Sequence, residues 1–120
     1  MPSAREDYLL RMLQQAAEAI RRVRERLAGG APATELLPEI RAAEGELLGP
    51  QAELLRRLDA RTAGERLGDA RRARLWADLL RAEADVHRQH RRPDVAAHLA
   101  SRAEVFTAIA DARERGSTNH

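Results

Sequence analysis

Two carboxylates and three histidines near the C-terminus form the best candidate for a chemical site. They are Glu83, His87, His90, Asp94 and His98. Residues three or four apart on a helix share a face, so Glu83, His87 and His90 can lie together. A turn at Arg91-Arg92-Pro93-Asp94 would then bring the last two residues of the set back to the same end. Imidazole and carboxylate groups arranged in this way could hold a divalent metal ion.

The same residues also have a structural interpretation, which we favour. His87 continues an apolar stripe that contains Leu80 and Ala84, as a core residue would. His90 adjoins Arg91–Arg92 in a turn that we expect to be solvated. The Glu-x-x-His pairs of a di-iron bundle are absent from the sequence. We therefore expect no metal and no cofactor, and the metal site remains the least favoured alternative.

Other catalytic arrangements are not evident in the sequence. There is no cysteine, which excludes thiolate catalysis and disulfides. No glycine-rich phosphate loop, nucleophile elbow or Ser-His-Asp arrangement is recognisable. We expect a protein without enzymatic activity.

The arginines suggest a second alternative, the binding of nucleic acid or another anion. All 21 basic residues are arginine, against 19 acidic residues, so the net charge is only +2. The arginine clusters are Arg21, Arg22, Arg24 and Arg26; Arg56 and Arg57; Arg71, Arg72 and Arg74; and Arg91 and Arg92. Aromatic residues make up only 2% of the chain, so it has few side chains on which nucleic-acid bases could stack. Because acids are interleaved with each cluster, we favour a salt-bridged helical surface, with pairs such as Glu18–Arg22 or Glu53–Arg57.

The first predicted helix spans residues 4–28. Ser3 and Glu6 fit a capping box, and Gly29-Gly30 ends the helix. Apolar residues recur every three or four positions at Leu9, Leu13, Ala16, Ile20, Val23 and Leu27. This seam resembles a heptad pattern, so residues 4–28 are where we expect a possible homodimer interface.

The middle of the chain predicts shorter helices. Pro38 fits only a first turn, so we expect a helix from near Leu37 to Leu48, with Glu44 and Glu46 facing outward. Residues 51–58 predict a helix with Leu54, Leu55 and Leu58 facing inward. Thr62 and Glu65 repeat the capping pattern and predict one more turn, which ends at Leu67.

The C-terminal third predicts two long helices, residues 69–91 with Asp69 as N-cap, and residues 93–115. The first carries two apolar stripes, one through Trp76 and one through Leu79, as expected for a central helix of a bundle. No pattern predicts a β-strand. We therefore predict one all-α domain over residues 1–115, a bundle of five or six helices, and a disordered tail at 116–120.

The stretch 79–106 resembles a tetratricopeptide repeat, a hairpin of two helices. Leu80, Ala84 and His87 match the large, small and aromatic positions of its first helix, and Ala96 and Ala103 match the small positions of its second. Glu83 and Ala100 depart from the usual pattern. The resemblance implies a protein-binding function. Since one repeat cannot bury its own apolar face, the other helices or another chain must cover it.

The whole chain is also similar to a family of small uncharacterised bacterial helical proteins. The likeness rests on Asp7-Tyr8-Leu9-Leu10-Arg11 near the start, on Glu46-Leu47-Leu48-Gly49 at a helix end, and on the final hairpin. It implies a fold and no activity.

Together these patterns predict a helical protein–protein interaction module, which would capture a peptide or helix in a groove and use arginines to select acidic partners. No apolar run approaches the ~18–20 residues of a membrane span, and the N-terminus lacks a signal-peptide pattern. We expect a cytoplasmic protein.

Overall fold

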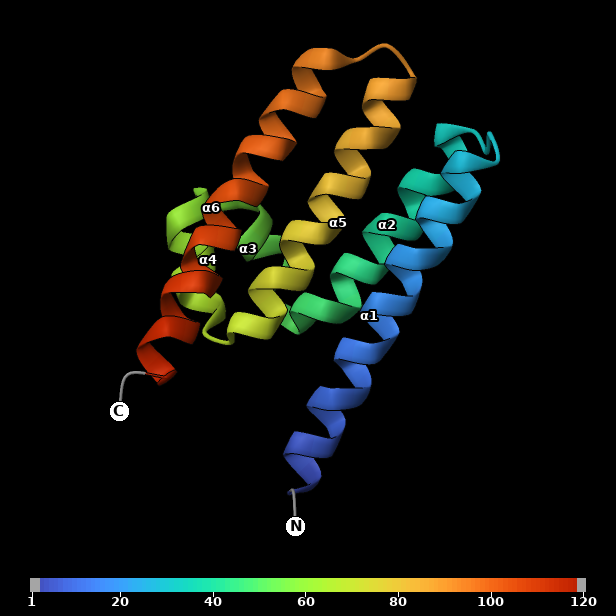
Figure 1. Cartoon of the computed structure of the whole chain (residues 1–120). Coiled ribbons are helices and arrows are strands. Elements are labelled where there is room, and N and C mark those ends of the chain that lie inside the picture. Colours follow the sequence, from blue (N-terminus) through green and yellow to red (C-terminus); the bar gives the residue numbers. More distant parts are fainter. Residues whose placement is uncertain (1–2, 119–120) are drawn as a thin grey trace.

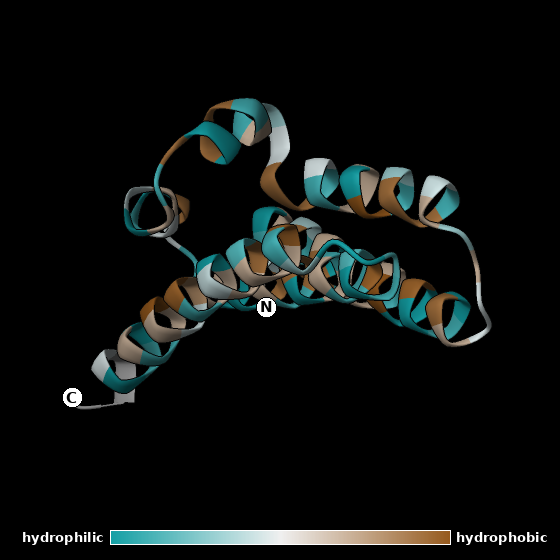
Figure 2. Ribbon diagram, turned by 90° about the horizontal axis from the view of Figure 1, so that it is seen from above, coloured by the Kyte–Doolittle hydropathy of each residue, from teal (hydrophilic) through white to brown (hydrophobic). Residues whose placement is uncertain are grey.

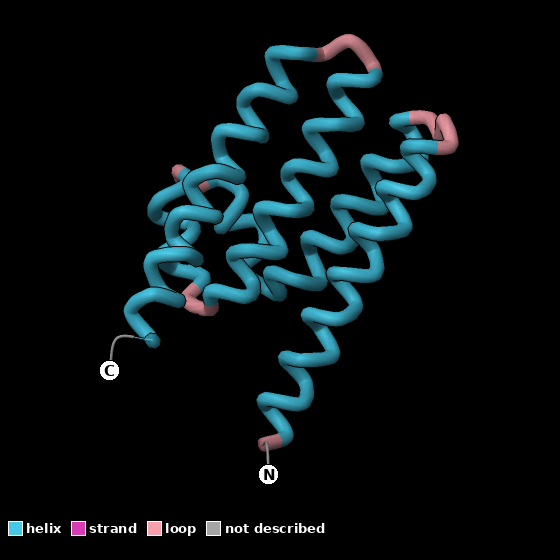
Figure 3. The backbone as a smooth tube through the Cα atoms, viewed as in Figure 1, coloured by secondary structure: helices cyan, strands magenta, loops and turns pink. Residues whose placement is uncertain are grey.

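The computed structural model describes residues 3–118 and is an all-α bundle (Figures 1 and 3). Within this range the structure has no strand. The helices are α1 (Ala4–Ala28), α2 (Ala33–Leu48), a 3₁₀ turn (Gly49–Gln51), α3 (Ala52–Arg57), α4 (Ala60–Leu67), α5 (Ala70–Gln89) and α6 (Pro93–Thr118). The predicted fold class is confirmed.

Helix α5 is the centre of the bundle. It contacts α1, α2, α4 and α6, and Figure 1 shows it between α6 and the pair of α1 and α2. Trp76 and Leu79, from its two apolar stripes, are both fully buried. Every helix in Figure 2 carries both hydrophobic and hydrophilic segments, as expected for helices that bury one side. The sequence prediction of a central helix is therefore confirmed.

Helix α1 has the predicted bounds and the predicted cap. The Ser3 hydroxyl accepts a hydrogen bond from the Glu6 amide at 3.1 Å. The seam from Leu13 to Leu27 is buried against α2 and α5. The chain itself thus covers the heptad-like surface that suggested a dimer.

Helix α2 begins at Ala33, about four residues earlier than predicted, and Pro38 lies inside it. Pro38 cannot donate to the carbonyl of Thr34, but both residues are exposed, so water can reach that carbonyl. Leu36 in the first turns is fully buried. We infer that this packing offsets the missing hydrogen bond, which is why the proline rule placed the start wrongly.

Glu44 does not face outward as predicted, although Glu46 does. Glu44 is only 3% exposed, and its carboxylate accepts a hydrogen bond from the Trp76 indole at 2.9 Å. It also pairs with Arg56 from α3 and with Arg41 at 3.2 Å. A carboxylate can be buried when it is paired and hydrogen-bonded in this way, and here it joins α2, α3 and α5.

The segment between α2 and α5 also differs from the prediction. Leu55 is buried, but Leu54 is 42% exposed and Leu58 is only half-buried. After the 3₁₀ turn, α3 has six residues, so a single position of its short face reaches the core. Helix α4 starts earlier than predicted, because Asp59 is its N-cap and accepts the Thr62 amide at 3.0 Å.

Two arginines, on α5 and α6, cap the carboxyl ends of α2 and α3. Arg72 donates two hydrogen bonds, of 2.7 and 3.0 Å, to the carbonyl of Leu47 near the end of α2. Arg102 donates to the carbonyls of Leu55 and Leu58 at the end of α3, at 3.0 and 2.9 Å. These carbonyls have no partner within their own helix, and a cation also suits the negative end of the helix dipole. Burial lowers the pKa of both guanidinium groups.

The hairpin of α5 and α6 is antiparallel (Figure 1), and Asp69 caps α5 as predicted. Helix α5 ends at Gln89, two residues before the predicted end, and Arg91 follows with a left-handed φ of 62° that turns the chain. Helix α6 continues to Thr118, so residues 116–118 of the predicted tail are helical, whereas 119 and 120 lie outside the described residues. Of the four alanines expected where the two helices touch, Ala84, Ala96 and Ala103 are buried, whereas Ala100 is half-buried.

Candidate functional site

The structure brings together only part of the predicted metal cluster. His87 Nε2 and Glu83 Oε2 are 3.9 Å apart on α5. His90 bonds the carbonyl of Val86 through Nδ1 at 2.8 Å, while Asp94 and His98 are exposed on α6. Across the described part of the chain, no three His, Cys, Asp or Glu side chains are placed to hold a metal ion.

His87 occupies a core position, as the structural interpretation expected. It is 8% exposed, and its Nδ1 atom is buried without a hydrogen-bond partner among the residues that the structure describes. Burial, and then the charges of Arg92 and His90, lower the pKa of His87. The imidazole is therefore neutral at pH 7, with the proton best placed on Nε2, toward Glu83, because a buried Nδ1–H would lack an acceptor.

Glu83 lies beside His87 with its side chain 13% exposed. Burial, and then the nearby Glu44 carboxylate, raise the pKa of Glu83, while Arg41 and Arg56 partly oppose this shift. A half-buried acid beside a neutral histidine is an arrangement that can exchange a proton. No further His, Cys, Asp or Glu among the described residues completes a metal centre around it.

We predict that Glu83→Gln stabilises the protein at pH 7, by roughly 1 kcal/mol, because ionised Glu83 is poorly solvated. The folded-state pKa of Glu83 lies above its ordinary value of 4.5, so its favourable contribution is present below pH 4.5 and is lost as pH rises through the folded-state pKa. The advantage of the glutamine should therefore shrink on acidification. Urea titrations at pH 7 and pH 4.5 measure it, with exposed Glu104→Gln as control. An equal gain at both pH values would contradict the raised pKa.

The arginine clusters lie on different elements: α1, α3, the start of α5, and the turn between α5 and α6. Most of their members are engaged within the chain: Arg24 with Asp85, Arg26 with Glu35 and Glu39, Arg56 with Glu44 and Glu53, Arg71 with Glu6 and Asp69, Arg72 with Leu47, and Arg74 with Asp111 and Glu114. In residues 3–118, Arg22, Arg57, Arg91 and Arg92 are exposed without such a partner. In this part of the chain, the ion pairs expected between Glu18 and Arg22 and between Glu53 and Arg57 are not formed. Glu53 forms an ion pair with Arg56 instead.

An apolar groove of about 370 Å³ lies between α1 and α5, which we call the α1/α5 groove. Leu10, Leu13 and Leu75 line it, and Leu10 is 40% exposed. Arg71 and Arg74 stand on its rim, and each already pairs with carboxylates of the chain. The groove thus offers apolar surface within a rim of neutralised charge.

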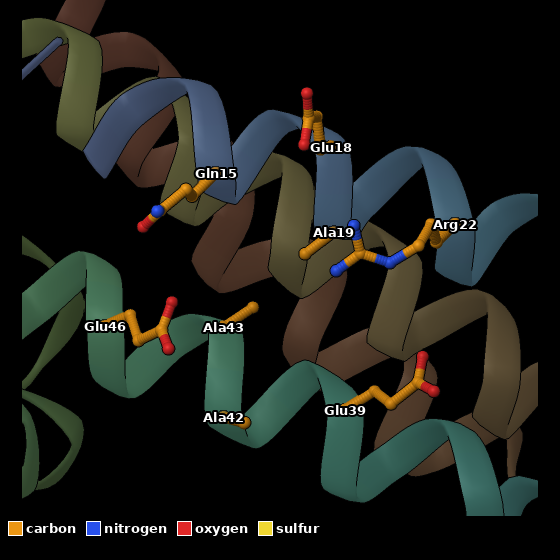
Figure 4. A pocket seen from close by; sticks show the side chains of 8 residues that line it. All are labelled: Gln15, Glu18, Ala19, Arg22, Glu39, Ala42, Ala43 and Glu46. Carbon is orange, nitrogen blue, oxygen red and sulfur yellow. The ribbon is translucent and has the colours of Figure 1, made fainter. Parts of the chain in front are cut away.

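A second groove follows the other flank of α1, between α1 and α2 (Figure 4). This α1/α2 groove has a volume of about 410 Å³ and continues into a hollow of about 400 Å³, which shares Gln15 and Glu46 with it. Alanines form its floor, and Figure 4 shows Arg22 from α1 and Glu39 and Glu46 from α2 reaching toward the gap. Tyr8, at the far end, is 65% exposed.

Sequence reasoning missed both grooves, although the stretch Tyr8-Leu9-Leu10-Arg11-Met12-Leu13 held a signal. Its apolar residues spread over more than half of the helix circumference, a wider stripe than one neighbouring helix covers. The seam becomes fully buried only from Leu13 onward. Tyr8 and Leu10 are therefore left exposed, one beside each groove.

Comparisons with protein-family models, with curated proteins and with solved structures found no match to this chain. Among the described residues, no helix combines the length and the apolar character needed to span a membrane.

Proposed function

We propose that this chain is a non-enzymatic helical protein–protein interaction module that binds an amphipathic partner helix in the α1/α5 groove. The observation that carries the proposal is the apolar lining of that groove, with Leu10 40% exposed beside Leu13 and Leu75. A helix that crosses there would bury apolar residues in the usual helix-in-groove manner.

Arginines on the rim supply selectivity in this proposal. The side chains of Arg71 and Arg74 are 46% and 38% exposed although both are paired. Each already pairs with two carboxylates of the chain, so an acidic partner would add a third carboxylate or replace one of these two. The tetratricopeptide-like character of the hairpin, the likeness to the small bacterial family and a cytoplasmic location belong to the same proposal, and the antiparallel α5–α6 pair with its buried alanines supports the first of these.

Affinity capture from a native cell lysate tests the module, with a variant that alters only the groove. We expect Leu10→Asp to lower recovery of the specific partner at least about tenfold, since it places a charge in the apolar contact. Leu54→Asp is the matched control, because Leu54 is 42% exposed on α3, away from the groove lining. Recovery of no partner, or equal recovery with both variants, would count against the proposal.

Anion binding by the free arginines is the second candidate. Arg91 and Arg92, in the α5–α6 turn, are exposed and have no acidic partner in the described part of the chain. A gel-shift titration with DNA and RNA at rising salt tests it, because phosphate contacts give a steep salt dependence. The absence of any shift at low salt would remove this candidate.

We also propose that the chain pairs with itself through α1, the segment 4–28 that the sequence suggested. Since the seam of α1 is covered within the chain, such a dimer must use the exposed side of the helix.

A further inference from the structure

The α1/α2 groove has a floor of small side chains, which would allow another helix to approach closely. Ala19 on α1 and Ala42 and Ala43 on α2 form this floor (Figure 4), and Gly45 continues it into the adjoining hollow. The two helices are antiparallel and pack against each other below it. The groove therefore runs along the exposed side of two helices that already pack against each other.

The two edges of this groove carry opposite charge. Arg11 and Arg22 lie along the α1 edge, and Glu39 and Glu46 along the α2 edge. Glu18 is the one acid on the α1 edge, and in Figure 4 it points away from α2. In residues 3–118, the side chains of Arg11, Arg22 and Glu46 have no ion pair or hydrogen bond, whereas Glu39 pairs with Arg26.

A face with one basic and one acidic edge is complementary to a copy of itself. A two-fold axis parallel to the helices places α1 of one chain over α2 of the other, so each basic edge meets an acidic edge. Neighbouring helices across the contact are then antiparallel, as in an up-and-down four-helix bundle. In such an isologous contact every favourable residue pair forms twice, once on each side of the two-fold axis.

We propose that the occupant of the α1/α2 groove is a second copy of this chain, in a two-fold dimer that pairs Arg11 of each copy with Glu46 of the other. Arg11 and Glu46 line the same hollow and lie at the same level of the helix pair. Exposed Tyr8 and half-buried Met12, in the same hollow, add apolar contact at the end of the interface. This inference deepens the proposed self-association and rests on it, but it is independent of helix capture in the α1/α5 groove.

The size of the contact sets its strength. Helix α2, the shorter of the pair, has 16 residues, so the face is about 24 Å long and about 20 Å wide. That is on the order of 500 Å² per chain, near the lower limit for a specific interface. The dimer is therefore weak and reversible, and high salt weakens it further.

Sedimentation velocity from about 5 to 500 µM chain tests the dimer, with circular dichroism to show that each variant is folded. Arg11→Glu and Glu46→Arg should each raise the dimer dissociation constant at least about tenfold, because each places like charges together twice. An equimolar mixture of the two variants should restore association to within about threefold of the original chain, since both contacts are then attractive. If Arg11 paired with Glu46 of its own chain instead, mixing the two variants would not restore association.

A monomer throughout the concentration range would overturn the proposal, and so would a dimer that ignores these charge reversals or is not restored by mixing. A dimer lost with Leu10→Asp alone would place the second copy in the α1/α5 groove and also overturn it. Partner capture by Arg11→Glu is measured in parallel, so failure of the dimer and failure of helix capture give different results.

Discussion

Replacement of Glu44 by alanine is expected to destabilise the protein by about 3–5 kcal/mol, the range for removal of one partner from a buried ion pair. The carboxylate is 3% exposed and accepts from Trp76 and Arg56. Without it, the indole N–H loses its acceptor inside the bundle, and the Arg56 guanidinium, which is only 19% exposed, keeps only its pair with exposed Glu53. The contact joins three helices, so α3 should loosen first.

Chemical denaturation followed by circular dichroism measures this loss, and tryptophan fluorescence gives a local signal. Trp76 is the single tryptophan, and its indole donates to Glu44, so its emission should change in the folded state. Glu46→Ala, measured at a chain concentration at which the protein is monomeric, is the matched control, because Glu46 is exposed on the same helix and should change stability by less than about 0.5 kcal/mol. Similar effects of the two substitutions would show that the Glu44 network does not stabilise the fold.

The contrast between these two glutamates shows what local sequence can predict. The burial of the α1 seam from Leu13 onward and the two-sided burial of α5 follow from regular apolar spacing, because these stretches pack against neighbouring helices. Glu44 looks like a surface residue in its own helix. Its indole partner is 32 residues away, and its burial depends on how α2, α3 and α5 meet.

Asp94 and His98 do not join Glu83 and His87, as the candidate metal cluster required, for a related reason. Ala96 and Ala103 are buried and fix which side of α6 faces the bundle. Asp94 and His98 are each two residues from Ala96, and a helix turns by about 100° per residue, so both point away from the core. The spacing of Glu83 and His87 places them on one face of α5, as the structure shows. The rotation of α6 about its own axis cannot be read from residue spacing alone.

The arginines illustrate the same limit. A cluster of arginines in sequence resembles a phosphate-binding surface, yet their partners here are carboxylates and helix carbonyls on other helices. Arg72 is such a case, since it donates to the carbonyl of Leu47. Arg102, outside the clusters, is similar: its guanidinium lies 5.3 Å from the Trp76 ring centre and 5.1 Å from that of Phe106 while it caps α3. A lysine could not make this planar, two-pronged contact, which gives a structural role to some of the exclusive use of arginine.

Substitution of Gly64 by alanine should have the second large effect, a loss of about 2–3 kcal/mol from overpacking. Gly64 is buried in α4 against α6, and a Cβ atom there would lie 2.5 Å from Cδ1 of Ile109 and 3.1 Å from Cδ1 of Phe106. The Ile109 methyl group can move. The Phe106 ring cannot easily do so, because it is fully buried and stacked on Trp76 with ring centres 4.2 Å apart.

Gly45→Ala provides the control that separates this clash from the general effect of alanine in a helix. Gly45 is also helical, but its nearest neighbour to a new Cβ is 3.9 Å away, so alanine should stabilise α2 by up to about 1 kcal/mol. Ile109→Val removes the closest methyl group, so it should recover at least about 1 kcal/mol of the Gly64→Ala loss, although not the part due to Phe106. Urea titrations of the two single variants and the double variant measure this coupling. Strict additivity would mean that α4 does not approach α6 as closely as the structure places it, whereas positive coupling would identify Gly64 as the residue that permits the contact.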